Sequence, residues 1–111
     1  MEEVKKKIVK MGDEVVQYFL ERDGKDISLN IKEDSEHYYL QAKSDVYISE
    51  YELEEIFSNY KIHRDLEYDF FWELVGENSE EAELELLFML ADDTKISYED
   101  NILEFNIRVD K

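Results

Sequence analysis

The stretch from residue 27 to residue 43 reads ISLNIKEDSEHYYLQAK, and it decides which kind of fold the chain can adopt. Apolar and polar residues alternate over residues 27–32, and the alternation returns over residues 38–43. A period of two is typical of a strand with one buried face. The polar residues 33–36, followed by His37, separate the two runs. The sequence therefore predicts an antiparallel hairpin with a four-residue loop.

An amphipathic helix is predicted before this hairpin, over residues 2–23. Its apolar residues recur every three or four positions and so share one stripe of the helix: Val4, Ile8, Met11, Val15 and Phe19. Gly12 lies inside the helix, where glycine costs up to ~1 kcal/mol relative to Ala, so a break is possible there. Gly24 is well placed as the residue just beyond the helix end.

A second helix is predicted to begin after Ser49. Ser49 and Glu52 have the three-residue spacing of a capping box, in which each side chain satisfies a free backbone N–H of the first turn. Ile48 and Leu53 occupy the two positions of a hydrophobic staple, which marks the same start. The buried stripe should contain Leu53, Ile56, Phe57 and Tyr60, and the helix should end near Lys61.

Residues 65–75 and 81–90 fit two kinds of structure. As strands, each places five apolar or aromatic side chains on one face, whereas a helix over residues 65–75 would keep no polar face. The composition of residues 81–90 instead favours a helix, because Glu, Leu, Met and Ala have high helix propensity. Periodicity is the stronger signal, so we predict two strands, with two helices as the alternative.

The chain ends in a further predicted hairpin, with strands around residues 96–98 and 103–109 and a turn at residues 99–101. The expected order is α-β-β-α-β-β-β-β. This order predicts a single α+β domain over residues 1–111, built as a two-layer sandwich with an antiparallel sheet of about six strands.

The net charge of −17 restricts the classes of partner. Residues 1–25 carry six acids and six bases, so the whole excess lies in residues 26–111. Residues 65–94 contain eleven acids and no base. Direct binding to nucleic acid or to an anionic membrane is not expected, because both require clustered Lys and Arg.

The sequence offers few groups for catalysis. It has no Cys and only two His residues, and its three Gly residues stand apart, so no phosphate-binding loop is expected. His63 beside Asp65 is a weak acid–base candidate, and His37 would be a metal ligand only with further ligands nearby. We predict a non-enzymatic protein without cofactor or metal.

The expected function is that of a small acidic binding or regulatory module that acts by protein–protein contact as a homodimer. Strands over residues 65–75 and 81–90 would present an outer face of acids and apolar residues, with the candidate partner-binding residues Glu67, Phe71, Glu73, Val75, Glu81, Glu83, Glu85, Leu87 and Met89. The partner could be a basic protein. The alternative is an acidic nucleic-acid mimic that occupies the basic groove of a DNA- or RNA-binding protein.

The expected location is the cytoplasm. The first residues show no apolar core of a signal peptide, and the longest apolar run covers only residues 86–91. A membrane-spanning helix needs ~20 apolar residues, so no membrane partner is expected.

Overall fold

The computed structural model describes residues 2–64 and 84–111 and shows an α+β fold with one antiparallel sheet. Helix α1 (Glu3–Glu21) is followed by strands β1 (Ile27–Glu33) and β2 (His37–Asp45) and by helix α2 (Glu50–Arg64). A short helix, α4 (Glu85–Leu90), precedes strands β3 (Asp93–Glu99) and β4 (Ile102–Asp110). The described residues contain four strands, so the predicted six strands and two-layer sandwich are not confirmed.

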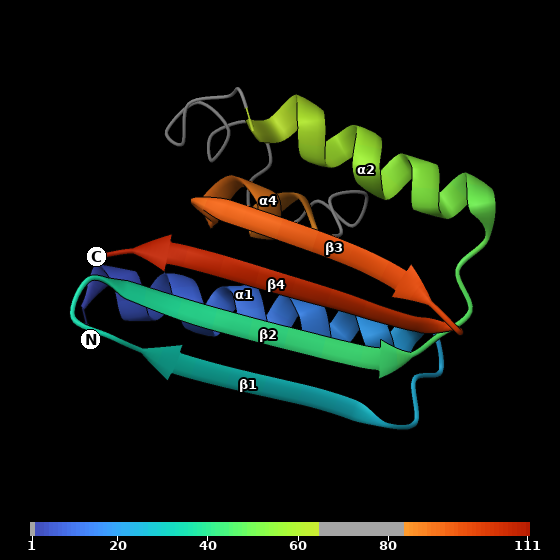
Figure 1. The fold of residues 1–111 in the computed structure, drawn as a ribbon, viewed down its shortest axis with the longest axis horizontal. Helices are drawn as coiled ribbons and strands as arrows, with labels where there is room; N and C mark the ends of the chain where they lie inside the picture. Colours follow the sequence, from blue (N-terminus) through green and yellow to red (C-terminus); the bar gives the residue numbers. More distant parts are fainter. Residues whose placement is uncertain (1, 65–83) are drawn as a thin grey trace.

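The four strands lie in the order β1-β2-β4-β3, with every neighbouring pair antiparallel. Both predicted hairpins are confirmed, and their strands β2 and β4 form the centre of the sheet. The loop of the first hairpin covers residues 34–36 and not 33–36, because Glu33 belongs to β1 and pairs with Tyr38. Figure 1 shows α1 lying across one face of the sheet and β1 at its edge. The turn between β3 and β4 uses Asp100 and Asn101, both with positive φ, which suits the right-handed twist of a hairpin.

The core lies between α1 and the sheet. The predicted stripe of α1 is confirmed, because Ile8, Met11, Val15 and Phe19 are all buried. The break at Gly12 does not occur: the helix is continuous, and Gly12 is itself buried. From the sheet, alternate residues of β2 and β4 complete the core: Tyr38, Leu40, Ala42, Leu103, Phe105, Ile107 and Val109.

Helix α1 ends one residue earlier than the position of Gly24 suggests. Asp23 has the positive φ (61°), and the N–H groups of Asp23 and Gly24 donate to the carbonyls of Leu20 and Phe19. This is a Schellman motif with Asp23, not Gly24, in the left-handed position. Gly24 is needed for space, since a Cβ there would lie 2.4 Å from the Ser44 Oγ.

Helix α2 begins as predicted but continues further. Ile56 is buried, Leu53 is partly buried and packs on the core, and Phe57 is 39% exposed rather than buried. The helix runs to Arg64 instead of ending near residue 61, so His63 belongs to α2.

The start of α2 gives a first testable prediction. The Ser49 Oγ accepts the backbone N–H of Glu52 at 3.1 Å, which satisfies one free donor of the first turn. The Ser49→Ala variant should lose about 1 kcal/mol of unfolding free energy, measured in urea melts. Ser97→Ala, at an exposed strand position, is the control. A loss below about 0.3 kcal/mol would show that the cap contributes little.

Glu52, the second residue of the predicted capping box, directs its side chain to α1. The Glu52 carboxylate accepts the Tyr18 hydroxyl at 3.0 Å and pairs with the Arg22 guanidinium at 2.5 Å. The Arg22 guanidinium in turn lies 3.6 Å from the centre of the Tyr18 ring. These contacts join the first turn of α2 to the last turn of α1.

Candidate functional site

The residues predicted to bind a partner are distributed differently from the expectation. Glu67, Phe71, Glu73, Val75, Glu81 and Glu83 lie outside the described residues. The last three predicted residues, Glu85, Leu87 and Met89, lie in helix α4 and not in a strand. Leu87 is fully buried and Met89 partly buried. The expected exposed strand face is therefore wrong for residues 85–90.

Burial in α4 follows a helical period. Leu87, Phe88 and Leu90 are buried, with spacings of one and two residues that place them on one side of the helix, and Leu84, just before the helix, is buried as well. Every position from 86 to 90 is apolar, so this sequence is compatible with the periodicity of a strand and with that of a helix. The helix propensity of Leu and Met, together with packing against α1 and α2, decides the structure.

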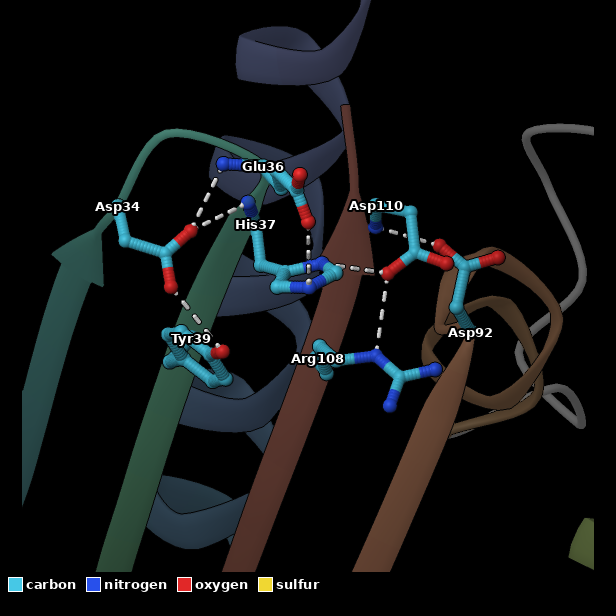
Figure 2. Close-up of polar contacts among 7 residues, drawn as sticks. All are labelled: Asp34, Glu36, His37, Tyr39, Asp92, Arg108 and Asp110. Atoms are coloured by element: carbon cyan, nitrogen blue, oxygen red, sulfur yellow. Dashed lines mark hydrogen bonds and ion pairs between the residues drawn. The ribbon is translucent and has the colours of Figure 1, made fainter.

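One cluster of titratable side chains gathers where β2 begins and β4 ends (Figure 2). The Nδ1 atom of His37 lies 2.8 Å from Oδ1 of Asp110, and the Arg108 Nε donates to the same oxygen at 3.0 Å. The backbone N–H of Asp110 donates to the Asp92 carboxylate at 2.6 Å. These contacts join the end of β4 to the start of β2 and to Asp92, the residue before β3.

The chemistry available to His37 is limited by its surroundings. A histidine that acts as a general base directs its second ring nitrogen at a substrate. Here Nε2 lies 3.9 Å from another carboxylate, that of Glu36 (Figure 2). Among residues 2–64 and 84–111, no three His, Asp or Glu side chains are arranged to hold a metal ion. The geometry supports the interpretation of a polar strand end.

The adjoining hairpin loop is organised by Asp34. Its carboxylate accepts the backbone N–H groups of Glu36 at 2.9 Å and His37 at 2.7 Å, and the Tyr39 hydroxyl at 3.2 Å. These hydrogen bonds, led by the N–H of Glu36, lower the pKa of Asp34 below its usual 3.8.

This lowered pKa predicts a pH dependence. A carboxylate with a depressed folded-state pKa contributes stability above its unfolded-state pKa, and the contribution is lost as pH falls through the folded-state pKa. The difference in unfolding free energy between wild type and Asp34→Ala should therefore be full at pH 7 and shrink below about pH 4. Urea melts at pH 7, 5 and 2.5 test this prediction. A pH-independent difference would contradict it.

A second surface is apolar and lies on α1 and β1. Val9 and Leu20 of α1 are 57% and 58% exposed, and Leu29 and Ile31 of β1 are 41% and 48% exposed. Val16 is partly buried on the same side of α1. We call these five residues the α1–β1 surface. The sequence alone did not predict this surface, although Val9, Val16 and Leu20 lie outside the predicted buried stripe of the helix.

The helix and the strand of this surface touch at Gly12. A Cβ on Gly12 would lie 3.5 Å from Cδ2 of Leu29, so Leu29 packs directly on the helix backbone there. Val9, Val16 and Leu20 are three, four and eight residues from Gly12, which places them on that side of α1. The exposed apolar side chains of helix and strand thus form one surface.

The α1–β1 surface also borders a free sheet edge. In the described part of the chain, β1 pairs with β2 alone, so its other side carries unpaired backbone groups (Figure 1). An exposed edge strand is a template for pairing with another chain unless charges or bulges protect it. Lys32 and Glu33 are the only charged residues of β1, and both lie at its end.

Charge is distributed unevenly around this surface. Residues 2–33, which include α1 and β1, carry eight acids and seven bases, whereas residues 34–111 carry 22 acids and six bases. The segment that contains the apolar surface is therefore close to neutral in a strongly acidic chain.

Comparisons with known proteins identify no relative. No protein-family model matches the chain, and the searches of curated proteins and of solved structures found no significant match. No helix among the described residues is both long enough and apolar enough to cross a membrane. What the structure defines is an α+β protein with an exposed apolar surface beside a sheet edge that no other described strand pairs with.

Proposed function

We propose that this chain is a small acidic, non-enzymatic binding or regulatory module that acts by protein–protein contact. The observation that carries the proposal is the α1–β1 surface, where four large apolar side chains are each more than 40% exposed. Contiguous exposed apolar side chains with polar neighbours are typical of protein interaction sites. The contact is thus assigned to α1 and β1 and not to the face predicted from residues 65–90.

Burial of this surface would supply a useful driving force. Removing apolar area from water stabilises a complex by about 25 cal/mol per Å², and full burial of a Leu or Ile side chain contributes about 1.5–3 kcal/mol. The four exposed side chains are half-buried already, so a partner gains part of this amount from each. The open β1 edge adds directional backbone hydrogen bonds, which fix the orientation of the partner.

The alternative function, mimicry of nucleic acid, depends on carboxylates spaced along strands, at Glu67, Glu73, Glu81, Glu83 and Glu85. The first four lie outside the described part of the chain, and Glu85 begins helix α4 and not a strand. The α1–β1 surface favours the protein-contact proposal, because an apolar surface has no counterpart in a phosphate backbone.

Site-specific photo-crosslinking tests the proposal. A benzophenone side chain at Leu20 should give covalent adducts with a protein in cells that contain the natural partners. The same group at Ser97, which is exposed on β3 at the opposite edge of the sheet from β1, is the control. Adducts at Leu20 and not at Ser97 would support the proposal. An absence of adducts at Leu20, or equal adducts at both positions, would overturn it.

A further inference from the structure

The hydrogen-bond pattern of β1 determines how another strand can join it. The N–H of Asp34 donates to the carbonyl of His37 at 2.9 Å, so this facing pair is hydrogen-bonded. In an antiparallel ladder such pairs alternate with pairs that are not hydrogen-bonded. Ser28, Asn30 and Lys32 therefore direct their backbone groups to β2. The odd-numbered residues of β1, from Ile27 to Glu33, direct theirs to the free edge.

We propose that the occupant of this edge is a second copy of the chain, whose β1 pairs antiparallel with the first about a two-fold axis at Asn30. This inference rests on the proposed function and names its partner. In this register Leu29 faces Ile31 of the second copy, and their outward N–H and C=O groups can be exchanged. All seven residues of β1 are paired, which a shift along the strand would not allow.

The side chains of β1 are complementary to themselves in this register. Each Leu29 meets an Ile31, and the two-fold axis repeats this pair, so four apolar side chains gather on the face that carries α1. Ser28 faces Lys32, and Asn30 faces its own copy across the axis. No two like charges face each other. Val9, Val16 and Leu20 of both helices lie beside this apolar cluster.

Charge also favours a second copy at this position. Two chains of −17 repel each other, so they can associate only where little of that charge is present. Residues 2–33 carry a net charge of only −1. A basic partner, by contrast, would gain more by binding the acidic remainder of the chain.

Disulfide crosslinking tests the register in a chain without native cysteine. Asn30 and its copy form a non-hydrogen-bonded pair with Cα atoms about 4.5 Å apart, within the range of a disulfide. Asn30→Cys should give a covalent dimer on mild oxidation. Ser28→Cys is the matched control: it is equally exposed, but the two copies would lie about 13 Å apart along the strand. A mixture of Ser28→Cys and Lys32→Cys should crosslink as a heterodimer.

Sedimentation equilibrium tests the association itself. The wild type should show a species of twice 13.4 kDa, and Ile31→Lys should weaken its formation at least tenfold, because charged residues protect an edge strand. Ile102→Lys is the control, since Ile102 is also a strand isoleucine and is 45% exposed on β4. Circular dichroism should show both variants folded.

The possible outcomes separate the two proposals. Crosslinking at Ser28→Cys and not at Asn30→Cys overturns the register, and a monomeric wild type at all concentrations overturns the second copy as occupant. In that case a photo-adduct from Leu20 with a different protein still supports protein contact. An absence of adducts at Leu20 overturns the proposed function as well.

Discussion

Replacing Leu87 with Lys is expected to unfold the protein. The Leu87 side chain is fully buried in α4, and α4 packs against both α1 and α2. A lysine at this position must either leave an ammonium group in an apolar environment or push the helices apart. Either outcome costs several kcal/mol, which approaches the total stability of ~5–15 kcal/mol that is typical of a small domain.

The matched control for this variant is Met89→Lys, two residues along the same helix. Met89 is partly buried, so a lysine there can extend its ammonium group into water. Circular dichroism and urea melts should show a folded Met89→Lys protein and an unfolded Leu87→Lys protein. A folded Leu87→Lys protein with near-normal stability would place Leu87 on the surface and would restore the strand interpretation of this segment.

The elements that sequence predicts well are those whose signals agree with one another. Apolar and polar residues alternate on either side of the loop at residues 34–36, and the loop itself is polar, so periodicity and turn chemistry lead to the same hairpin. Ser49, Glu52 and Ile48 all mark the start of one helix. In each case the local signal determines the structure without help from distant residues.

The failures have a different physical origin. Residues 86–90 are apolar at every position, so no period can be read from them, and packing against two other helices decides the outcome. Gly24 resembles a helix terminator, but Asp23 adopts the left-handed conformation and Gly24 provides room for Ser44. Close approach between residues 20 positions apart cannot be inferred from the local sequence.

The candidate site depended on tertiary structure even more strongly. Leu29 and Ile31 follow the same alternation as buried strand residues, and they remain exposed because β1 lies at the edge of the sheet. Strand order is not encoded in the period of a single strand. The apolar residues Val9 and Leu20 were visible in the sequence, but their position beside β1 follows from the packing of Leu29 on Gly12.

The second large effect is expected for Phe105→Ala, at the centre of the sheet. Phe105 is fully buried on β4, and its ring centre lies 6.0 Å from that of Phe19 and 6.5 Å from that of Tyr18. Its neighbour on β2 is Ala42, which is too small to fill the space that a lost ring would leave. The surrounding backbone belongs to the two central strands and can collapse only slightly into such a cavity.

Phe105→Ala should therefore lower the unfolding free energy by about 3–5 kcal/mol, the range found for core phenylalanines. Ile102→Ala on the same strand, at a side chain that is 45% exposed, should lose less than about 1 kcal/mol. Urea melts of both variants at low protein concentration measure this difference without a contribution from association. A loss below 2 kcal/mol for Phe105→Ala would mean that the aromatic contacts between α1 and the sheet are looser than these distances indicate. Because Phe105 lies on a central strand and not on the β1 edge, the fraction of the variant that remains folded should still form the Asn30→Cys crosslink.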